Sequence, residues 1–208
     1  MPDLVAEFAD KAVGAGPIPS AQAWFAGGER VGYDPKARAI VAVQDAPLKI
    51  FLRRQGDVAH AISFLPGYPD GSFGWAKVLP HLPNATEMPK LFVEYVGMGD
   101  SDKPKDYAYS TAERTDLVEA IWRELSVQST TLVAFDFSSL VILEHLRRQL
   151  ERLERGETPA GRTYAAFSSS MVGSSRMGTL TPGTPRRFCA ASQTEPAGAW
   201  GSPSRYSK

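Results

Sequence analysis

One carboxylate stands where a short apolar run gives way to a long amphipathic one. Asp136 follows residues 130–135 (TTLVAF), which are apolar, β-branched and short enough for a buried strand. The residues two positions before and two after it, Ala134 and Ser138, are small. A sharp strand-to-helix turn that exposes a nucleophile needs small residues at these two positions, because larger side chains would collide there. Asp136 is therefore a candidate carboxylate nucleophile.

Two other interpretations of this stretch compete with a nucleophilic Asp136. Asp and Ser are preferred helix N-caps, so the carboxylate could simply cap the helix that follows, and this stretch alone does not separate the two roles. Ser138 could be the nucleophile instead. The residues two positions before and after it are Asp136 and Leu140, and neither is small enough for the sharp turn. We therefore keep the cap as the alternative and set Ser138 aside.

The composition argues against several classes of protein. The formal net charge is +0, so nothing attracts the chain as a whole to nucleic acid or to an anionic membrane. The single cysteine, Cys189, rules out an internal disulfide framework and fits a reducing compartment. No apolar run approaches the roughly 18 residues of a membrane span, and the start of the chain lacks the pattern of a signal peptide. We expect a soluble cytoplasmic protein with no nucleic-acid or membrane partner.

Charge and composition change near residue 168. Residues 169–208 hold five of the 23 basic residues and one of the 23 acidic residues, and they are rich in Ser, Gly, Pro and Thr. Such a segment buries too little apolar surface to offset the entropy lost on ordering. We therefore divide the chain into an N-terminal arm (residues 1–30), an incomplete core (residues 31–168) and a disordered tail (residues 169–208).

The elements that must position Asp136 alternate between strand and helix. A first strand is expected near residue 39, and residues 48–53 alternate like an edge or hairpin strand. Further strands are predicted at residues 59–65, 91–95, 130–135 and 163–167, with helices at residues 73–82, 111–125 and 139–155 between them. This alternation predicts an α/β fold, with a mostly parallel sheet flanked by helices. In the last helix, one face is expected to carry Leu143, Leu146, Leu150 and Leu153.

The carboxyl ends of the predicted parallel strands are the expected place for chemistry. Three loops share that edge and are expected to converge: residues 66–72, 96–104 and 136–139. Other kinds of site find little support. The sequence has no metal-ligand spacing, and Gly97-Met98-Gly99 lacks the third glycine of a dinucleotide site, so we expect no metal or cofactor. Arginines in the last helix alternate with glutamates, which favours a solvated helix face over a phosphate site.

Three motifs at these loops together resemble those of an α/β hydrolase. They are Leu65-Pro66-Gly67-Tyr68-Pro69, Gly97-Met98-Gly99-Asp100-Ser101-Asp102-Lys103-Pro104 and Ala134-Phe135-Asp136-Phe137-Ser138. In order and spacing they are similar to the branch that contains haloalkane dehalogenases, epoxide hydrolases and mesoderm-specific-transcript proteins. The resemblance covers roughly residues 22–168 and implies the N-terminal part of an α/β-hydrolase fold.

The resemblance implies covalent catalysis on a small apolar electrophile, of the epoxide or alkyl halide class. Asp136 would attack the electrophilic carbon to form an ester, which an activated water would then hydrolyse. Backbone N–H groups of Phe137 and Tyr68 would form the oxyanion hole, and Phe135 would lie at the substrate site. Tyr68-Pro69 is also compatible with an ordinary turn.

The chain departs from the family pattern at several positions. Pro66 and Phe135 stand where the family has His, Ser138 where it has Gly, and Glu94 where it has Asp. The family's later catalytic acid and water-activating His have no counterpart after residue 168. We interpret the three histidines, His60, His81 and His145, as structural or surface residues. His145 lies on the helix about 13 Å beyond Asp136, too far to act as its base.

These departures lead to two hypotheses about function. In the first, the chain is an α/β hydrolase that is impaired and cannot complete multiple turnovers. In the second, it is a non-catalytic, truncated or frameshifted hydrolase-fold protein that acts at most as a binding module. In either case, the strand at residues 163–167 would be an uncovered edge that is open to self-association.

Overall fold

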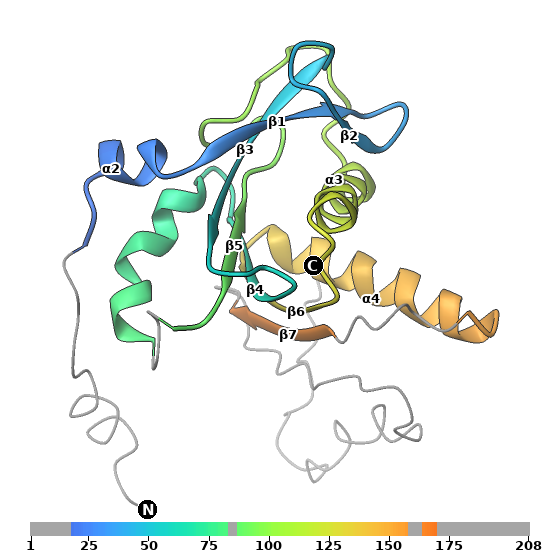
Figure 1. The fold of residues 1–208 in the computed structure, drawn as a ribbon. Coiled ribbons are helices and arrows are strands. Elements are labelled where there is room, and N and C mark those ends of the chain that lie inside the picture. The colour runs from blue at the N-terminus through green and yellow to red at the C-terminus, as the bar shows by residue number, and fades with distance from the viewer. Residues whose placement is uncertain (1–17, 83–86, 158–163, 170–208) are drawn as a thin grey trace, which may run out of the picture.

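The computed structural model describes residues 18–82, 87–157 and 164–169 (Figure 1). Most of the predicted arm and nearly all of the predicted tail lie outside these ranges, so the domain boundaries stay predictions. In chain order the elements are α2 (Ala21–Ala26), β1 (Glu29–Asp34), β2 (Ala39–Val41), β3 (Leu48–Gln55), β4 (His60–Leu65), η1 (Ser72–Lys77), η2 (Leu79–His81), β5 (Lys90–Val93), α3 (Thr111–Glu124), β6 (Ser129–Phe135), α4 (Ser138–Glu154) and β7 (Tyr164–Ser169).

The described strands form one mixed sheet in the order β2-β1-β3-β5-β4-β6-β7. The pairs β4/β5, β4/β6 and β6/β7 are parallel, whereas β1/β2, β1/β3 and β3/β5 are antiparallel. The connection from β1 to β2 is only residues 35–38, which is too short for the crossover that parallel pairing requires. The parallel half, β5-β4-β6-β7, has the predicted βαβ character. The α/β class with flanking helices is confirmed.

Three elements differ in detail from the sequence predictions. A strand, β1, begins at Glu29, before the strand expected near residue 39. β3 is neither an edge nor a hairpin strand, because it lies between β1 and β5 and its residues 50–52 are buried on both faces of the sheet. The helix predicted at residues 73–82 is two 3₁₀ segments, η1 and η2; Pro80, which has no backbone N–H to donate, lies in the second.

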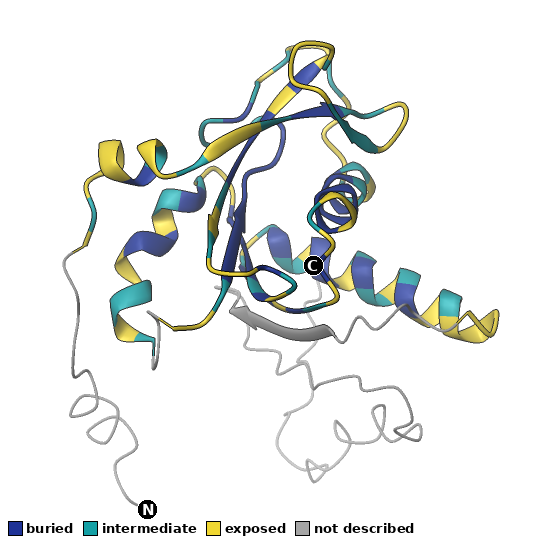
Figure 2. Cartoon of the chain, viewed as in Figure 1, coloured by how far each residue is buried: buried dark blue, intermediate teal, exposed yellow. Residues whose placement is uncertain are grey.

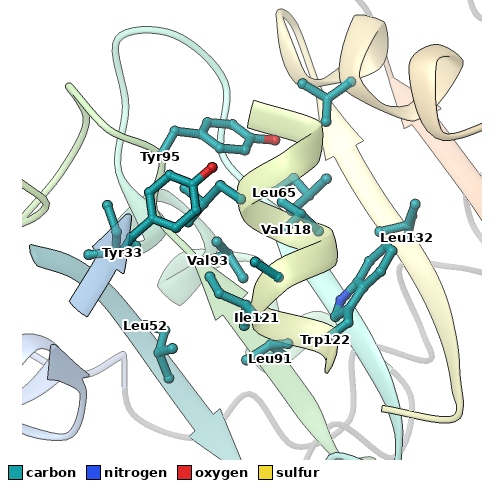
Figure 3. Packing of buried hydrophobic residues seen from close by; sticks show 14 of the residues in the cluster. Tyr33, Leu52, Leu65, Leu91, Val93, Tyr95, Val118, Ile121, Trp122 and Leu132 are labelled. Atoms are coloured by element: carbon teal, nitrogen blue, oxygen red, sulfur yellow. The ribbon is translucent and has the colours of Figure 1, made fainter. Parts of the chain in front are cut away.

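Two apolar clusters cover the opposite faces of the sheet. Successive residues of a strand point to opposite faces, so β5 sends Leu91 and Val93 to one cluster and Phe92 to the other. The larger cluster packs under α3, where Ile121 and Trp122 contact the sheet (Figure 3). The smaller one joins α2 and η1 to the other face and contains Trp24, Phe64, Trp75, Ala76 and Phe92. The strands that carry the predicted site are therefore held from both sides.

The predicted leucine face of α4 is not its buried face. Leu143, Leu150 and Leu153 are 49%, 45% and 44% exposed, while Val141, Ile142, His145 and Gln149 are buried. Figure 2 shows buried and exposed residues side by side along α4. The side of α4 that packs on α3 is instead selected by charge, because acidic residues of α3 pair with Arg148 and Arg152. The arginines of α4 are thus only partly a solvated face.

Candidate functional site

Asp136 forms the turn between β6 and α4. Its φ is 53°, in the left-handed region that residues other than glycine seldom adopt. The Ser139 N–H donates to the Asp136 carbonyl at 3.0 Å and closes the turn. The residue is exposed, although its neighbours Ala134 and Ser138 are buried. The sequence predicted this sharp turn with small buried neighbours, and the structure has it.

The Asp136 carboxylate contacts a second loop of the same sheet edge. Its Oδ2 accepts a hydrogen bond of 2.9 Å from the Tyr68 N–H, in the loop after β4. The residue that precedes the first helical residue of α4 is Phe137, and its side chain makes no cap hydrogen bond. The Asp136 carboxylate is therefore bonded to the loop after β4, whereas an N-cap side chain accepts from backbone N–H groups of its own helix.

Ser138 ties the turn to two other strands. Its Oγ donates to the Pro66 carbonyl at the end of β4, and it also lies 2.8 Å from the Tyr95 hydroxyl just after β5. Because the single Ser138 hydroxyl proton is used on Pro66, Tyr95 must donate to Ser138. A serine in place of the family's glycine is therefore accommodated by two buried hydrogen bonds.

Phe135 packs on the side of the turn that faces η1. Its ring makes an edge contact with Trp75, with the ring centroids 5.3 Å apart. A Cβ atom on Gly67 would come within 2.4 Å of the Phe135 ring, so this close approach requires glycine. Tyr68 beside it is 66% exposed. Phe135, Tyr68 and Phe137 thus surround Asp136, and their contact with a substrate stays a prediction.

Glu94 joins the other two predicted loops to each other. Its Oε1 accepts from both the N–H and the hydroxyl of Ser72 at 2.7 Å, and its Oε2 accepts from the Asp100 N–H. Burial raises the pKa of Glu94, and the hydrogen bonds from Ser72 and Asp100 oppose this only in part. Together with the contact between Tyr68 and Asp136, these bonds confirm that the three loops converge. The sequence showed Glu94 only as a departure from the family's Asp, and its linking role was missed.

None of the three histidines of the sequence reaches Asp136. His60 opens β4 and bonds Ser129 at 2.7 Å, and these two residues pair at the amino ends of β4 and β6, the opposite end from Asp136. His81 is exposed in η2. His145 is buried between α3 and α4, with its ring centroid 4.9 Å from that of Trp122.

The buried contact between α3 and α4 is ionic. Glu119 of α3 faces His145 at 3.5 Å and Arg152 at 3.0 Å, and Arg148 lies at 3.5 Å. Burial by itself raises the pKa of Glu119, but contacts with His145, Arg152 and Arg148 outweigh it and lower the pKa to about 2. Burial also lowers the pKa of His145, although Glu119 opposes this. An ionised Glu119 follows, with the two arginines among the compensating charges.

The described part of the chain has neither a cluster of metal ligands nor a membrane-spanning helix. Within residues 18–82, 87–157 and 164–169, no group of three or more His, Cys, Asp or Glu could hold a metal ion. In the same ranges, no helix combines the length and the apolar character needed to cross a membrane.

The chain is similar in sequence to parts of several longer curated proteins. No family model matches the sequence. "Putative hydrolase LipZ" of Mycobacterium tuberculosis (strain ATCC 25618 / H37Rv) is 31% identical over 124 residues, which are 60% of this chain and 41% of LipZ. The mesoderm-specific transcript homolog proteins of Bos taurus and Homo sapiens are 33% and 32% identical over 89 residues, 42% of this chain and 26% of theirs. The chain thus spans about two fifths of LipZ and about a quarter of the others.

Solved structures show a similar partial overlap. The haloalkane dehalogenase DatA from Agrobacterium tumefaciens C58 superposes with a TM-score of 0.48 at 24% identity, over 67% of this chain and 40% of DatA. Est816, described as an N-acyl homoserine lactone degrading enzyme, gives 0.48 at 21% identity, over 68% of this chain and 45% of its own. Both scores are below 0.5. Over the part that it shares with the curated relatives, this chain is similar in sequence to a putative hydrolase and to mesoderm-specific transcript proteins.

Proposed function

We propose that Asp136 is a carboxylate nucleophile that attacks the electrophilic carbon of an epoxide or an alkyl halide. With an alkyl halide, a bond forms between a carboxylate oxygen and the carbon, and the carbon–halogen bond breaks as the halide leaves with the electron pair. With an epoxide, the ring carbon–oxygen bond breaks and the alkoxide takes a proton from water. Both reactions leave an ester on Asp136.

The observation that carries this proposal is the position of the carboxylate. Asp136 is exposed at the carboxyl end of β6, in left-handed backbone geometry, and Tyr68 N–H holds its Oδ2 at 2.9 Å. Left-handed geometry in a non-glycine residue is typical of strained functional turns. The Tyr68 N–H bonds to the carboxylate and Phe137 follows Asp136 directly, which supports the assignment of these two N–H groups as the oxyanion donors for ester hydrolysis.

The second step, hydrolysis of the ester, needs a general base near Asp136. His60 and His145 are held in contacts away from the turn, and His81 lies in η2. We therefore expect that the ester accumulates on this chain and that turnover stops after one event per molecule. This expectation concerns the chain as given, whose relatives are longer.

Intact-mass measurement after incubation with 1-bromohexane or styrene oxide tests the proposal. In a Cys189→Ser background, which removes the one thiol of the sequence, we expect one alkyl group per chain, mapped to Asp136 by peptide sequencing, and none in Asp136→Asn. Asp45→Asn is the matched control, because it removes another exposed carboxylate, in the loop between β2 and β3. Equal labelling of Asp136→Asn would refute the nucleophile. Steady release of hexanol or of the diol would refute the single turnover.

A second candidate function is a non-catalytic association module in the cytoplasm. Two observations favour it: β7 is the edge of the described sheet, and α4 beside it exposes Leu143, Leu150 and Leu153. Light scattering across a concentration series would measure self-association, which Leu143→Gln combined with Leu150→Gln should weaken. A monomer at every concentration would exclude self-association.

A further inference from the structure

Arg114 of α3 is a buried cation that the proposed chemistry does not use. The residue is only 5% exposed, and its Nε and Nη1 atoms are buried without a hydrogen-bond partner. In the described residues, no carboxylate oxygen forms an ion pair with it. Its guanidinium carbon instead lies 4.2 Å from the centre of the Phe137 ring and 5.2 Å from that of Tyr95.

The two aromatic rings are the partners of this cation. A guanidinium within about 6 Å of a ring centroid is attracted by the negative face of the ring, and the attraction grows when both are removed from water. Removing a charged guanidinium from bulk water is costly unless neighbouring groups compensate it. The cation and the rings therefore hold one another in place.

One ring belongs to the turn that presents Asp136, and the other is hydrogen-bonded to it. Phe137 follows Asp136 directly, so the orientation of its ring and that of its backbone N–H are linked. Tyr95 donates to Ser138, which in turn donates to the Pro66 carbonyl. Arg114 thus contacts the first residue after the nucleophile and, through one hydroxyl, the second.

We propose that Arg114 is a positioning residue: its contacts with the rings of Phe137 and Tyr95 hold the turn after Asp136, and with it the reacting carboxylate, in the geometry for attack. The inference rests on the proposed role of Asp136. A purely structural arginine would stabilise α3 without affecting the geometry of the turn. A positioning arginine also sets the rate of ester formation, since a displacement of about 1 Å at the reacting atoms can cost roughly 100-fold.

Two substitutions separate these roles. Arg114→Met keeps the length and apolar stem of the side chain but removes the cation, whereas Arg114→Lys keeps the cation. Arg123→Met is the matched control, because Arg123 is exposed on the same helix. The measurement is the rate of alkylation of Asp136 at increasing 1-bromohexane concentration, which gives a limiting rate and a half-saturating concentration.

We expect Arg114→Met to lower the limiting rate by about 10- to 100-fold with an unchanged half-saturating concentration. Arg114→Lys should recover most of the rate, and Arg123→Met should match the parent chain. A folded Arg114→Met with the parent rate would overturn the inference. If Arg114→Met does not fold, Tyr95→Phe, which keeps the ring and removes the link to Ser138, should show a smaller loss of rate, and an unchanged rate would count against the inference.

Amide hydrogen exchange tests the positioning role of Arg114 without relying on alkylation of Asp136. The Ser139 and Leu140 amides, which donate to the carbonyls of Asp136 and Phe137, should exchange at least tenfold faster in Arg114→Met than in the parent chain, while amides in β4 should be unaffected. If the parent chain takes up no alkyl group, the proposed role of Asp136 fails and exchange alone decides the positioning role. Unchanged exchange at Ser139 would then refute it.

Discussion

Replacing Glu119 by Gln removes the central charge of the contact between α3 and α4. In the folded chain the neighbouring cations lower the pKa of Glu119 from 4.5 to about 2, although burial opposes them. In the unfolded chain these neighbours are dispersed, and the carboxyl group has its ordinary pKa. The folded state therefore keeps Glu119 ionised to a lower pH than the unfolded state does.

The sign of the pH dependence follows from this difference. Above about pH 4.5, Glu119 is ionised in both states and its whole contribution to stability is present. As the pH falls, the unfolded chain takes up the proton first, so stability decreases until about pH 2, where the folded chain is protonated too. The gap between 4.5 and about 2 corresponds to about 3 kcal/mol. Because the side chain is slightly exposed, we expect about 2 to 3 kcal/mol.

Urea unfolding followed by tryptophan fluorescence measures this contribution. At about pH 7, the parent chain should be about 2 to 3 kcal/mol more stable than Glu119→Gln, and the difference should shrink toward zero near pH 2. Glu124→Gln, an exposed carboxylate on the same helix, should follow the parent chain throughout. A difference that stays constant down to about pH 2.5 would show that the lost interaction is not ionic.

Two further substitutions, Gly99→Ala and Ser138→Ala, test the loops and the turn, and Gly156→Ala is the control for the first. Gly99→Ala should lower the free energy of unfolding by about 2 to 4 kcal/mol, because φ is 49° and a Cβ would lie 2.1 Å from Glu94 Oε2. Gly156→Ala should lower it by only about 1 to 2 kcal/mol, because φ is 72° but nothing lies within 4 Å of a Cβ there. Urea midpoints compare the two, and equal losses would contradict the crowding argument. Ser138→Ala should cost about 1 to 3 kcal/mol by the same assay, because it leaves the buried Tyr95 hydroxyl without its acceptor; an unchanged midpoint would contradict this.

The turn at Asp136 was predictable because its requirements are local. A short apolar run, one carboxylate and small residues two positions away are all visible within ten residues of sequence. The parallel half of the sheet was predictable for the same reason, since each strand and helix shows its own periodicity. The placement of the residues around Asp136 follows from the order of these elements.

The face of α4 and the role of Arg114 were not predictable, because both depend on contacts between distant segments. Periodicity identifies the leucines of α4 as its apolar stripe, but the buried face is decided by Glu119, 33 positions before its partner Arg152. Arg114 looks like an ordinary surface residue on an amphipathic helix. Only the approach of Phe137 and Tyr95 shows that its charge is enclosed.

Because the backbone at Asp136 is left-handed, the residue types that make this position most stable differ from the one that the proposed reaction needs. Glycine adopts a φ of 53° without the roughly 1 to 2 kcal/mol penalty of a side chain, and asparagine tolerates it well. A library of variants at position 136 that is sorted for thermal resistance should therefore enrich glycine and asparagine. Sorting the same library for covalent labelling should keep aspartate, so selection for robustness alone would remove the proposed nucleophile.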